Sequence, residues 1–571
     1  MNNEKGNVEP AIVQVDFAAP VGALDRIWTS IGFDEINWSY TPQGKDLLAM
    51  LSQEVAEQPY YVRNHNAFTS GNGLSYPAGG STNVYREDAE GNPIYNWEIL
   101  DQVYDAYVSN NFHPLIELGF LPFDLVPSEV KEYTGFGNKG TLDLDLGKED
   151  YENGKWKLPP KDYNKWQNLV EAFVAHLVER YGADEVATWY FELWNEPDIT
   201  HYWRGTVDEY CKLYDYSVAG ATRAFPRVKI GGPGSTDKGS PFLHHFLNHC
   251  TRGHNYLTGQ TGTQLDFISF HTKGAYYSPR RTYGHPVETA SPSVSKMMYD
   301  IQRCLGVIAE FPELTGKPVF VDECDPAVGT IYGVYDNPNF IVCNTEYYPT
   351  FVAALVGEIL KLNGNVPIPV TMITHWAFYF EGKRFFEGNR TLTTNHNVAN
   401  PIVAGLKMLG MLGKERVTLQ SSQAVNSLGE GYTGQTQFID GLATRGALQG
   451  DTARSSVILW NHCDDWTVNG PGQVQLNLAN LPGEAGQTIE VRHWRIDADH
   501  SNAFTEWVKL GRPEGPDEEQ LARLKACQQL ALLEEPRQVT LDKNGTLQLS
   551  FDLPIHALSL LEITAPSSSN S

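Results

Sequence analysis

Short apolar runs alternate with amphipathic stretches along the first 400 residues of the chain. Eight of these runs have the length of a strand: residues 27–33, 60–65, 113–120, 188–194, 228–234, 266–271, 318–323 and 372–378. Helical periodicity lies between them, most clearly over residues 163–182 and 348–364. Strands that alternate regularly with helices are typical of a (β/α)8 TIM barrel, whose active site lies at the carboxyl ends of its strands. We therefore predict an α/β protein with a barrel over residues 21–400.

The pattern changes after residue 400. A helix is predicted at 402–413, and the β-like runs 455–462, 473–481, 488–497 and 546–564 follow, separated by turn residues. This spacing predicts an accessory antiparallel β-sandwich domain over residues 401–571, with a frayed polar tail. The run 11–20 also has strand character, so residues 1–20 are expected to join that sandwich.

Charge and cysteine content narrow the class of protein. There are 69 acidic and 43 basic residues, a net charge of −26, which disfavours nucleic acid and anionic membranes as partners. The N-terminus has no apolar leader and no membrane-spanning run is present, so a cytoplasmic location is expected. The seven scattered cysteines predict free buried thiols, and their spacing indicates no metal site. The oligomeric state is not predicted.

The fourth apolar run ends in the sequence Trp194-Asn195-Glu196-Pro197. Because proline cannot continue a ladder, the strand should stop there and leave Glu196 at the mouth of the barrel. A carboxylic acid near aromatic rings is suited to protonate the leaving oxygen of an acetal. The structural alternative is a capping or ion-paired surface glutamate.

The seventh run ends in a second carboxylate, Glu323. The ends of strands four and seven face one another across a barrel, and a retaining glycosidase needs two carboxyl groups about 5–5.5 Å apart. Asp322 and Asp325 are rival nucleophiles. Strand alternation points Asp322 away from Glu323, and Asp325 is expected in the following loop as a supporting residue, so Glu323 is preferred.

Several longer strings resemble glycoside hydrolase family 39, and within it the α-L-iduronidases more than the β-xylosidases. The resemblance spans roughly residues 20–565. It is carried by YYVRNHNAFTSGNGLSY (60–76), WYFELWNEPD (189–198), KIGGPGS (229–235), HCTRGHNYLTGQTGTQLDFISFHTKGA (249–275), VFVDECDPAVG (319–329), NRTLT (389–393) and WVKLGRPEGPDEEQLARLKA (507–526).

The resemblance implies a role for each matching residue. Glu196 would be the acid/base and Glu323 the nucleophile. The other residues would contact the substrate. Arg63 and His65 would line the pocket floor, and Asn195 would hold the 2-hydroxyl of the sugar. They are Arg63, His65, Asn195, His271, Lys273, Gly329, Glu381 (or Glu387, for the family's hydroxyl-binding acid after strand eight) and Arg390. Taken singly, His65 and His271 have an alternative as buried barrel histidines, and Lys273 and Arg390 as ion-paired loop residues.

These observations predict a retaining exo-glycoside hydrolase that releases terminal α-L-iduronic acid from an oligosaccharide or small glycoside, without metal or cofactor. Arg390 and the backbone N–H of Gly329 suit the carboxylate that distinguishes a uronide from a pentoside. A β-xylosidase or arabinosidase of the same family is the alternative within this chemistry. A catalytically silent carbohydrate-binding protein is the alternative of another class.

Overall fold

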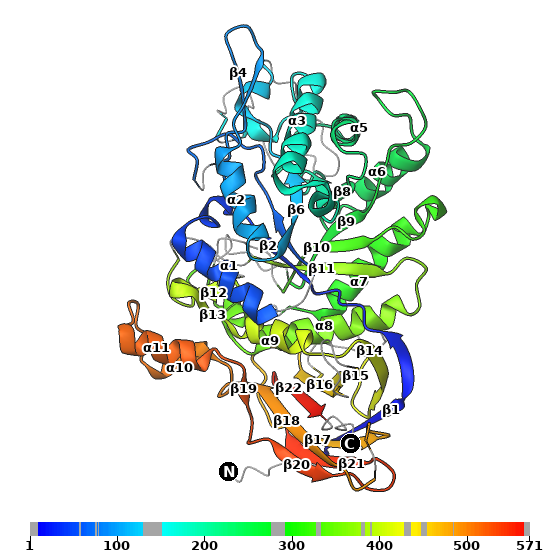
Figure 1. The fold of residues 1–571 in the computed structure, drawn as a ribbon, viewed down its shortest axis with the longest axis vertical. Coiled ribbons are helices and arrows are strands. Elements are labelled where there is room, and N and C mark those ends of the chain that lie inside the picture. Colours follow the sequence, from blue (N-terminus) through cyan, green and yellow to red (C-terminus); the bar gives the residue numbers. More distant parts are fainter. Residues whose placement is uncertain are drawn as a thin grey trace, which may run out of the picture.

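The computed structural model describes residues 9–55, 59–74, 77, 79–128, 151–152, 154–275, 292–326, 333–377, 383–388, 391–426, 436–446, 454–483 and 485–564. Two large sheets organise these residues. One is a closed parallel barrel, and the other is a curled, mainly antiparallel sheet that lies below the barrel in Figure 1.

Eight parallel strands close the barrel in the order β10-β11-β2-β3-β6-β7-β8-β9. Each corresponds to one of the eight apolar runs, so the predicted barrel is confirmed. The strands are β2 (Ser30–Phe33), β3 (Tyr60–Asn64), β6 (Phe112–Leu118), β7 (Tyr190–Leu193), β8 (Ile230–Ser235), β9 (Ile268–Lys273), β10 (Val319–Asp325) and β11 (Val370–Trp376).

A helix follows each barrel strand and packs around the outside of the barrel (Figure 1). Capping side chains begin several of these helices. The Asp162 side chain accepts the Asn164 N–H at the start of α3, and Thr206 forms a capping box with Glu209 at the start of α5. The eight helices are α1 (Pro42–Val55), α2 (Glu98–Val108), α3 (Tyr163–Tyr181), α5 (Val207–Ala224), α6 (Ser240–Arg252), α7 (Val294–Ile308), α8 (Tyr347–Asn363) and α9 (Pro401–Gly410). The short elements α4 (Ala183–Val186), β4 (Tyr85–Glu87), β5 (Pro93–Tyr95), β12 (Thr393–Thr394) and β13 (Val398–Ala399) lie in the connections.

Helix α8 joins the two parts of the molecule. Every residue from Tyr347 to Leu360 is buried, because α8 lies between the barrel and the second sheet. Gly357 lets the Trp460 ring of β16 approach closely: a Cβ there would lie 2.7 Å from the ring. Over these residues the helix therefore has no solvent-exposed face, unlike an ordinary outer helix of a barrel.

The second sheet has ten strands in the order β19-β18-β22-β16-β15-β14-β1-β17-β21, with β20 on β18. All pairs are antiparallel except β1 with β17. Apolar residues of its strands enclose a core of their own, as a sandwich does. The strands are β1 (Ala11–Ala23), β14 (Glu415–Ser421), β15 (Phe438–Arg445), β16 (Arg454–His462), β17 (Gln473–Ala479), β18 (Thr488–Ile496), β19 (Ala531–Leu532), β20 (Arg537–Thr540), β21 (Leu547–Asp552) and β22 (Leu558–Thr564).

The connection between β18 and β19 is helical, which the strand-like pattern of this region did not predict. It forms α10 (Ala503–Lys509) and α11 (Glu518–Cys527), the second begun by an Asp517–Gln520 capping box. Trp507 and Leu524 belong to one apolar cluster with Phe385 and Phe386, which follow β11 of the barrel, and the Trp507 ring lies 5.3 Å from the Phe386 ring. The apolar residues of this segment thus contact a barrel loop instead of the sheet.

All seven cysteines lie within the described residues, and all are free thiols. Six are buried and Cys527 is partly exposed. Burial raises the pKa of Cys304 to about 12, which keeps this thiol protonated and unreactive.

Candidate active site

The chain turns sharply where β7 ends at Leu193, and this turn brings Glu196 to the mouth of the barrel. Trp194 has a φ of 65° and Glu196 a φ of 40°, in the left-handed region that few non-glycine residues adopt. The buried Trp194 indole donates to the carbonyl of Tyr202 at 2.9 Å, and the Glu196 N–H donates to the carbonyl of Gly234 at 3.0 Å. Backbone strain that neighbours hold in place is typical of a functional side chain.

Strand β10 contains a bulge at Asp322. Its register with β9 shifts between Val321 and Glu323, so the strict alternation expected for this strand does not hold. Both acidic side chains reach the same guanidinium: Arg63 Nε lies 3.5 Å from Asp322 Oδ2, and Nη1 lies 3.1 Å from Glu323 Oε1. The expectation that Asp322 points away is therefore wrong. Asp322 is completely buried, whereas Glu323 retains some exposure.

The carboxylates of Glu196 and Glu323 meet at one point. One oxygen of each lies within 4.8 Å of the other and of a His271 ring nitrogen. His271 Nδ1 is 2.9 Å from Glu196 Oε1 and 3.8 Å from Glu323 Oε2. This separation matches the ~5–5.5 Å of a retaining glycosidase and is shorter than the ~6.5–9.5 Å of an inverting one.

Positive charge surrounds Glu323. Lys273 Nζ lies 2.7 Å from Oε2, Arg63 Nη1 3.1 Å from Oε1 and His65 Nε2 3.5 Å from Oε1. Burial alone would raise the pKa of Glu323, but Lys273, His271, His65 and Arg63 outweigh it and hold the pKa well below its usual range. Glu323 is therefore ionised at neutral pH, as a nucleophile must be.

Asp325 supports this arrangement from the end of β10. The Lys273 ammonium donates to both Asp325 and Glu323. Asp325 Oδ1 also accepts the backbone N–H of Trp376 at 2.9 Å. The strand continues to Asp325, so this residue is not in the loop where it was expected, but it has the supporting position expected of it.

Two further carboxylates, Glu192 and Glu117, contact Arg63 below the site. Nε lies 2.8 Å from Glu192, Nη2 lies 3.4 Å from Glu117, and Nη2 also donates to Asn195 Oδ1 at 3.1 Å. Burial raises the pKa of Glu117 to about 8, and burial together with the charge of Glu192 raises the pKa of Asp322. Sequence reasoning missed Glu117 and Glu192. The signal available was an acidic residue inside an apolar strand, which must find a partner in the interior.

The structure brings five of the predicted substrate contacts to the carboxylate pair. Arg63 contacts both His65 and Asn195, while His271 and Lys273 contact the glutamates directly. Three others, Gly329, Glu381 and Arg390, lie outside the described residues.

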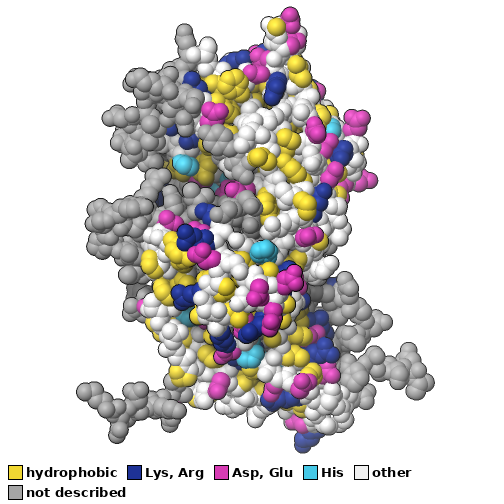
Figure 2. Space-filling model, turned by 90° about the vertical axis from the view of Figure 1, so that its left-hand side faces the viewer, with side chains coloured by type: hydrophobic (Ala, Val, Ile, Leu, Met, Phe, Trp, Pro, Cys, Tyr) yellow, Lys and Arg dark blue, Asp and Glu magenta, His cyan; other side chains and the backbone are white. Residues whose placement is uncertain are grey.

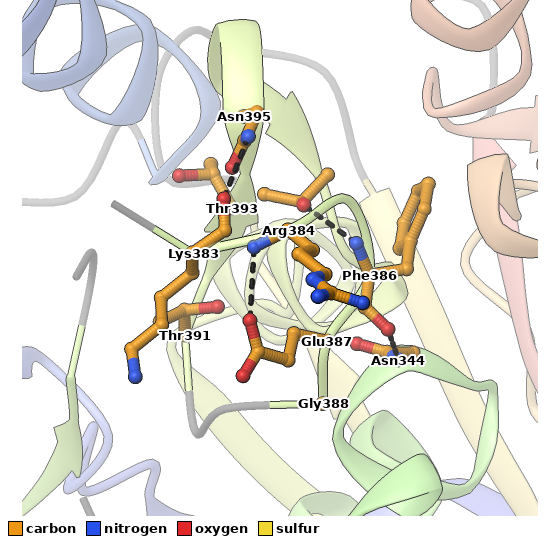
Figure 3. A pocket seen from close by; sticks show the side chains of 10 residues that line it. Asn344, Lys383, Arg384, Phe386, Glu387, Gly388, Thr391, Thr393 and Asn395 are labelled. Atoms are coloured by element: carbon orange, nitrogen blue, oxygen red, sulfur yellow. Dashed lines mark hydrogen bonds between the residues drawn. The ribbon is translucent and has the colours of Figure 1, made fainter. Parts of the chain in front are cut away.

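Glu387, the alternative hydroxyl-binding acid, folds back on its own loop. Its carboxylate accepts the Arg384 N–H at 2.9 Å and lines a narrow polar pocket shown in Figure 3. In the same pocket the Asn395 side chain donates to the carbonyl of Lys383, and that of Asn344 to the carbonyl of Phe386. The pocket holds about one water molecule, so it has no room for a sugar.

Two side chains at the mouth were not singled out in the sequence. Trp376, the last residue of β11, lies with its ring 4.7 Å from the His65 ring and 5.1 Å from the Arg63 guanidinium. Its Nε1 donates to Asp34 Oδ2 at 2.8 Å, and Asp34 Oδ1 lies 3.3 Å from His65 Nδ1. Asp34 directly follows an apolar strand, and Glu196 follows one after two residues. An acidic residue just after an apolar run could therefore have identified Asp34 as well.

Within the described residues, Glu196, His271 and Glu323 are close enough to share a metal ion. Arg63 and Lys273, however, both contact Glu323 and oppose a second cation there. The donor set fits acid–base chemistry better than metal binding.

The molecular surface carries both signs of charge. Among the described residues on the face in Figure 2, acidic and basic side chains are interspersed and form no continuous basic stripe. Among the described residues, no helix combines the length and the apolar character needed to cross a membrane.

Comparison with known proteins gives the family. The signature described as "Glycosyl hydrolases family 39" matches residues 12–545. A β-xylosidase of Geobacillus stearothermophilus is 24% identical over 93% of this chain and 91% of its own length. The human α-L-iduronidase is 25% identical over 97% of this chain and 79% of its own length.

Solved structures agree on the fold. A bacterial orthologue of human α-L-iduronidase superposes with a TM-score of 0.74 over 98% of this chain and 85% of its own, at 22% identity. The residues that the family signature matches, 12–545, contain the whole barrel, both glutamates and most of the second sheet. The chain belongs to glycoside hydrolase family 39.

Proposed function

We propose that this glycosidase is a retaining exo-hydrolase in which Glu323 is the nucleophile and Glu196 the acid/base, and that it releases terminal α-L-iduronic acid. The observation that carries the proposal is the pair of carboxylates within 4.8 Å of each other, of which Glu323 is ringed by cations. That asymmetry favours Glu323 as the permanent anion and leaves proton transfer to Glu196.

The reaction proceeds in two displacements. Glu196 protonates the glycosidic oxygen while a Glu323 oxygen attacks the anomeric carbon, so the carbon–oxygen bond to the leaving group breaks as an ester to Glu323 forms. Glu196, now a carboxylate, takes a proton from water, and that water attacks the anomeric carbon. The ester breaks, the sugar leaves with its configuration retained, and Glu196 is protonated again.

Neighbouring side chains position the two glutamates and the sugar. His271 Nδ1, 2.9 Å from Glu196 Oε1, fixes the acid/base in the direction of the nucleophile. Arg63 holds Asn195 by its amide oxygen, which turns the amide nitrogen to donate to the 2-hydroxyl of the sugar. The low exposure of Glu323 and Lys273 supports a closed pocket around one terminal sugar rather than an open cleft.

The uronide is favoured by two basic residues in the strings shared with iduronidases, Lys273 and Arg390. Lys273 lies at the nucleophile on β9, within reach of substituents on the same sugar. An additional charge-assisted hydrogen bond to the uronide carboxylate contributes about 1.5–3 kcal/mol, or about one to two orders of magnitude in selectivity.

A β-xyloside is the second candidate substrate. It is favoured by the β-xylosidase relative, which matches over nearly its full length, and by the engagement of Lys273 with two protein carboxylates. A neutral pentoside needs no further cation at the pocket.

The test is the kcat/KM of the purified chain on aryl α-L-iduronide, β-D-glucuronide, β-D-xyloside and α-L-arabinoside. The proposal expects the iduronide to lead by at least tenfold, and a leading xyloside selects the second candidate. Glu323→Gln must abolish turnover and keep the fold by circular dichroism. Failure of every glycoside, together with sugar binding by calorimetry, would identify a silent binding protein and refute the proposed activity.

A further inference from the structure

Asp34 lies at the mouth of the barrel, directly after β2. It comes from the strand adjacent to β11 on one side and β3 on the other. Among the described residues, its Oδ2 accepts Trp376 Nε1 at 2.8 Å, and its Oδ1 faces His65 Nδ1 at 3.3 Å. Both partners also contact Arg63 of the catalytic cluster.

Asp34 and the nucleophile contact opposite nitrogens of one imidazole. His65 Nδ1 faces Asp34, and Nε2 lies 3.5 Å from Glu323 Oε1. The two contacts and the width of the ring bring Oδ1 of Asp34 within about 9 Å of Oε1 of Glu323. A pyranose ring with its hydroxyls spans such a gap when its anomeric carbon is at Glu323.

Exposure also distinguishes Asp34 from the carboxylates below it. Its side chain and that of Glu196 are each 14% exposed, whereas those of Glu117, Glu192 and Asp322 are completely buried. A carboxylate that is held in place yet partly exposed at the mouth can reach a ligand without first reorganising.

We propose that Asp34 is a substrate-binding residue that accepts hydrogen bonds from hydroxyls of the terminal sugar on the side of the ring opposite the anomeric carbon. This inference rests on the proposed function and adds a specificity determinant on the first barrel strand. Hydrogen bonds from hydroxyls to a carboxylate are among the strong ones, and a site built to make them discriminates steeply against an analogue that lacks the hydroxyl. The negative charge of Asp34 also disfavours an anionic substituent at the same positions, so a uronide carboxylate must occupy another edge of the pocket.

A double-mutant cycle between enzyme and substrate tests this contact. Wild type and Asp34→Ala are compared on the aryl glycoside that the wild type hydrolyses best and on its 3-deoxy and 4-deoxy analogues. We expect wild type to lose about 10- to 100-fold in kcat/KM on at least one deoxy analogue. In Asp34→Ala the parent substrate should be slowed by a similar factor, and the deoxy penalty should shrink to threefold or less.

A purely structural role gives a different result. If Asp34 only orients His65 and Trp376, the variant is slower on all three substrates and keeps the full deoxy penalty, which overturns the proposal. Unchanged kcat/KM of the variant on the parent substrate also overturns it. Asp34→Asn keeps the shape and an acceptor for Trp376 if the alanine variant unfolds, and Asp46→Ala on the exposed face of α1 is the matched control.

The same cycle can be run on binding alone. Calorimetry of methyl glycosides and their deoxy analogues with Glu323→Gln, with and without Asp34→Ala, needs no turnover. A lost deoxy penalty there supports the contact even if the wild type hydrolyses nothing, and a retained penalty refutes it even if the enzyme is active. The failure of this inference is thereby distinguishable from failure of the proposed function.

Discussion

The charge of Lys273 should set the ionisation of Glu323, the proposed nucleophile. Its ammonium lies 2.7 Å from Glu323 Oε2, and both side chains are at most 10% exposed. Lys273→Met keeps much of the length and apolar stem of the side chain and removes its charge. The pKa of Glu323, now held well below its usual range, should rise in this variant, so the carboxylate is protonated at a higher pH.

The size of the shift follows from the strength of one charge-assisted bond. Coulomb's law at 2.7 Å with an effective permittivity of about 20 gives a ceiling of about 6 kcal/mol. A measured bond of this kind contributes about 1.5–3 kcal/mol, and one pKa unit corresponds to about 1.4 kcal/mol. The acidic limb of the kcat/KM profile should therefore move up by about one to two pH units, because Arg63 and His65 remain in place.

The assay is the pH dependence of kcat/KM on the best aryl glycoside, from pH 3 to 9. Lys361→Met is a matched control, because Lys361 also lies between two carboxylates, 2.7 Å from Glu358 and 2.7 Å from Asp440, outside the site. The control should leave the acidic limb where it is in the wild type. An unshifted limb in Lys273→Met would refute the electrostatic role assigned to Lys273.

Three further variants test other parts of the account. Burial raises the pKa of Glu117 to about 8, so the stability that its protonated form contributes is complete below the unfolded pKa near 4.5 and is lost as pH rises towards 8. Glu117→Gln should therefore flatten the fall in the free energy of urea unfolding between these pH values. An unchanged slope would contradict this role. A Cβ on Gly32 would lie 1.7 Å from the Trp376 ring, so Gly32→Ala should displace that ring. The variant should lose about 1–3 kcal/mol of stability in thermal unfolding, and its kcat/KM should fall about 100-fold. Full activity would show that the ring position is not needed. Glu196→Ala should lose about 10²–10⁴-fold on a poor leaving group and far less on dinitrophenolate, with azide restoring turnover; equal losses on both would remove it as the acid.

The barrel was predictable because each of its strands is a short apolar run that is followed by a helical stretch. The positions of Glu196 and Glu323 were predictable for the same reason, since both follow such a run and carboxyl ends of barrel strands meet. The sequence strings around Arg63, His65 and Lys273 predicted that these residues lie at the site, and the structure brings them together there.

What could not be predicted depends on contacts between distant segments. The bulge at Asp322 leaves no mark in the alternation of β10, so its side chain was assigned to the wrong face. Glu117 and Glu192 are acidic residues in strands that otherwise read as core, and their partner Arg63 is supplied by a third strand. Asp34 acquires its significance only because β11 closes the barrel beside β2 and brings Trp376 to it.

The most direct test is to trap the covalent intermediate. The chain is incubated with an activated 2-deoxy-2-fluoro glycoside of the sugar that it hydrolyses best, and the labelled peptide is sequenced by mass spectrometry. We predict stoichiometric loss of activity and one fluoroglycosyl ester, on Glu323. An ester on Asp322, Asp325 or Glu196, or inversion of the anomeric configuration seen by proton NMR, would contradict it.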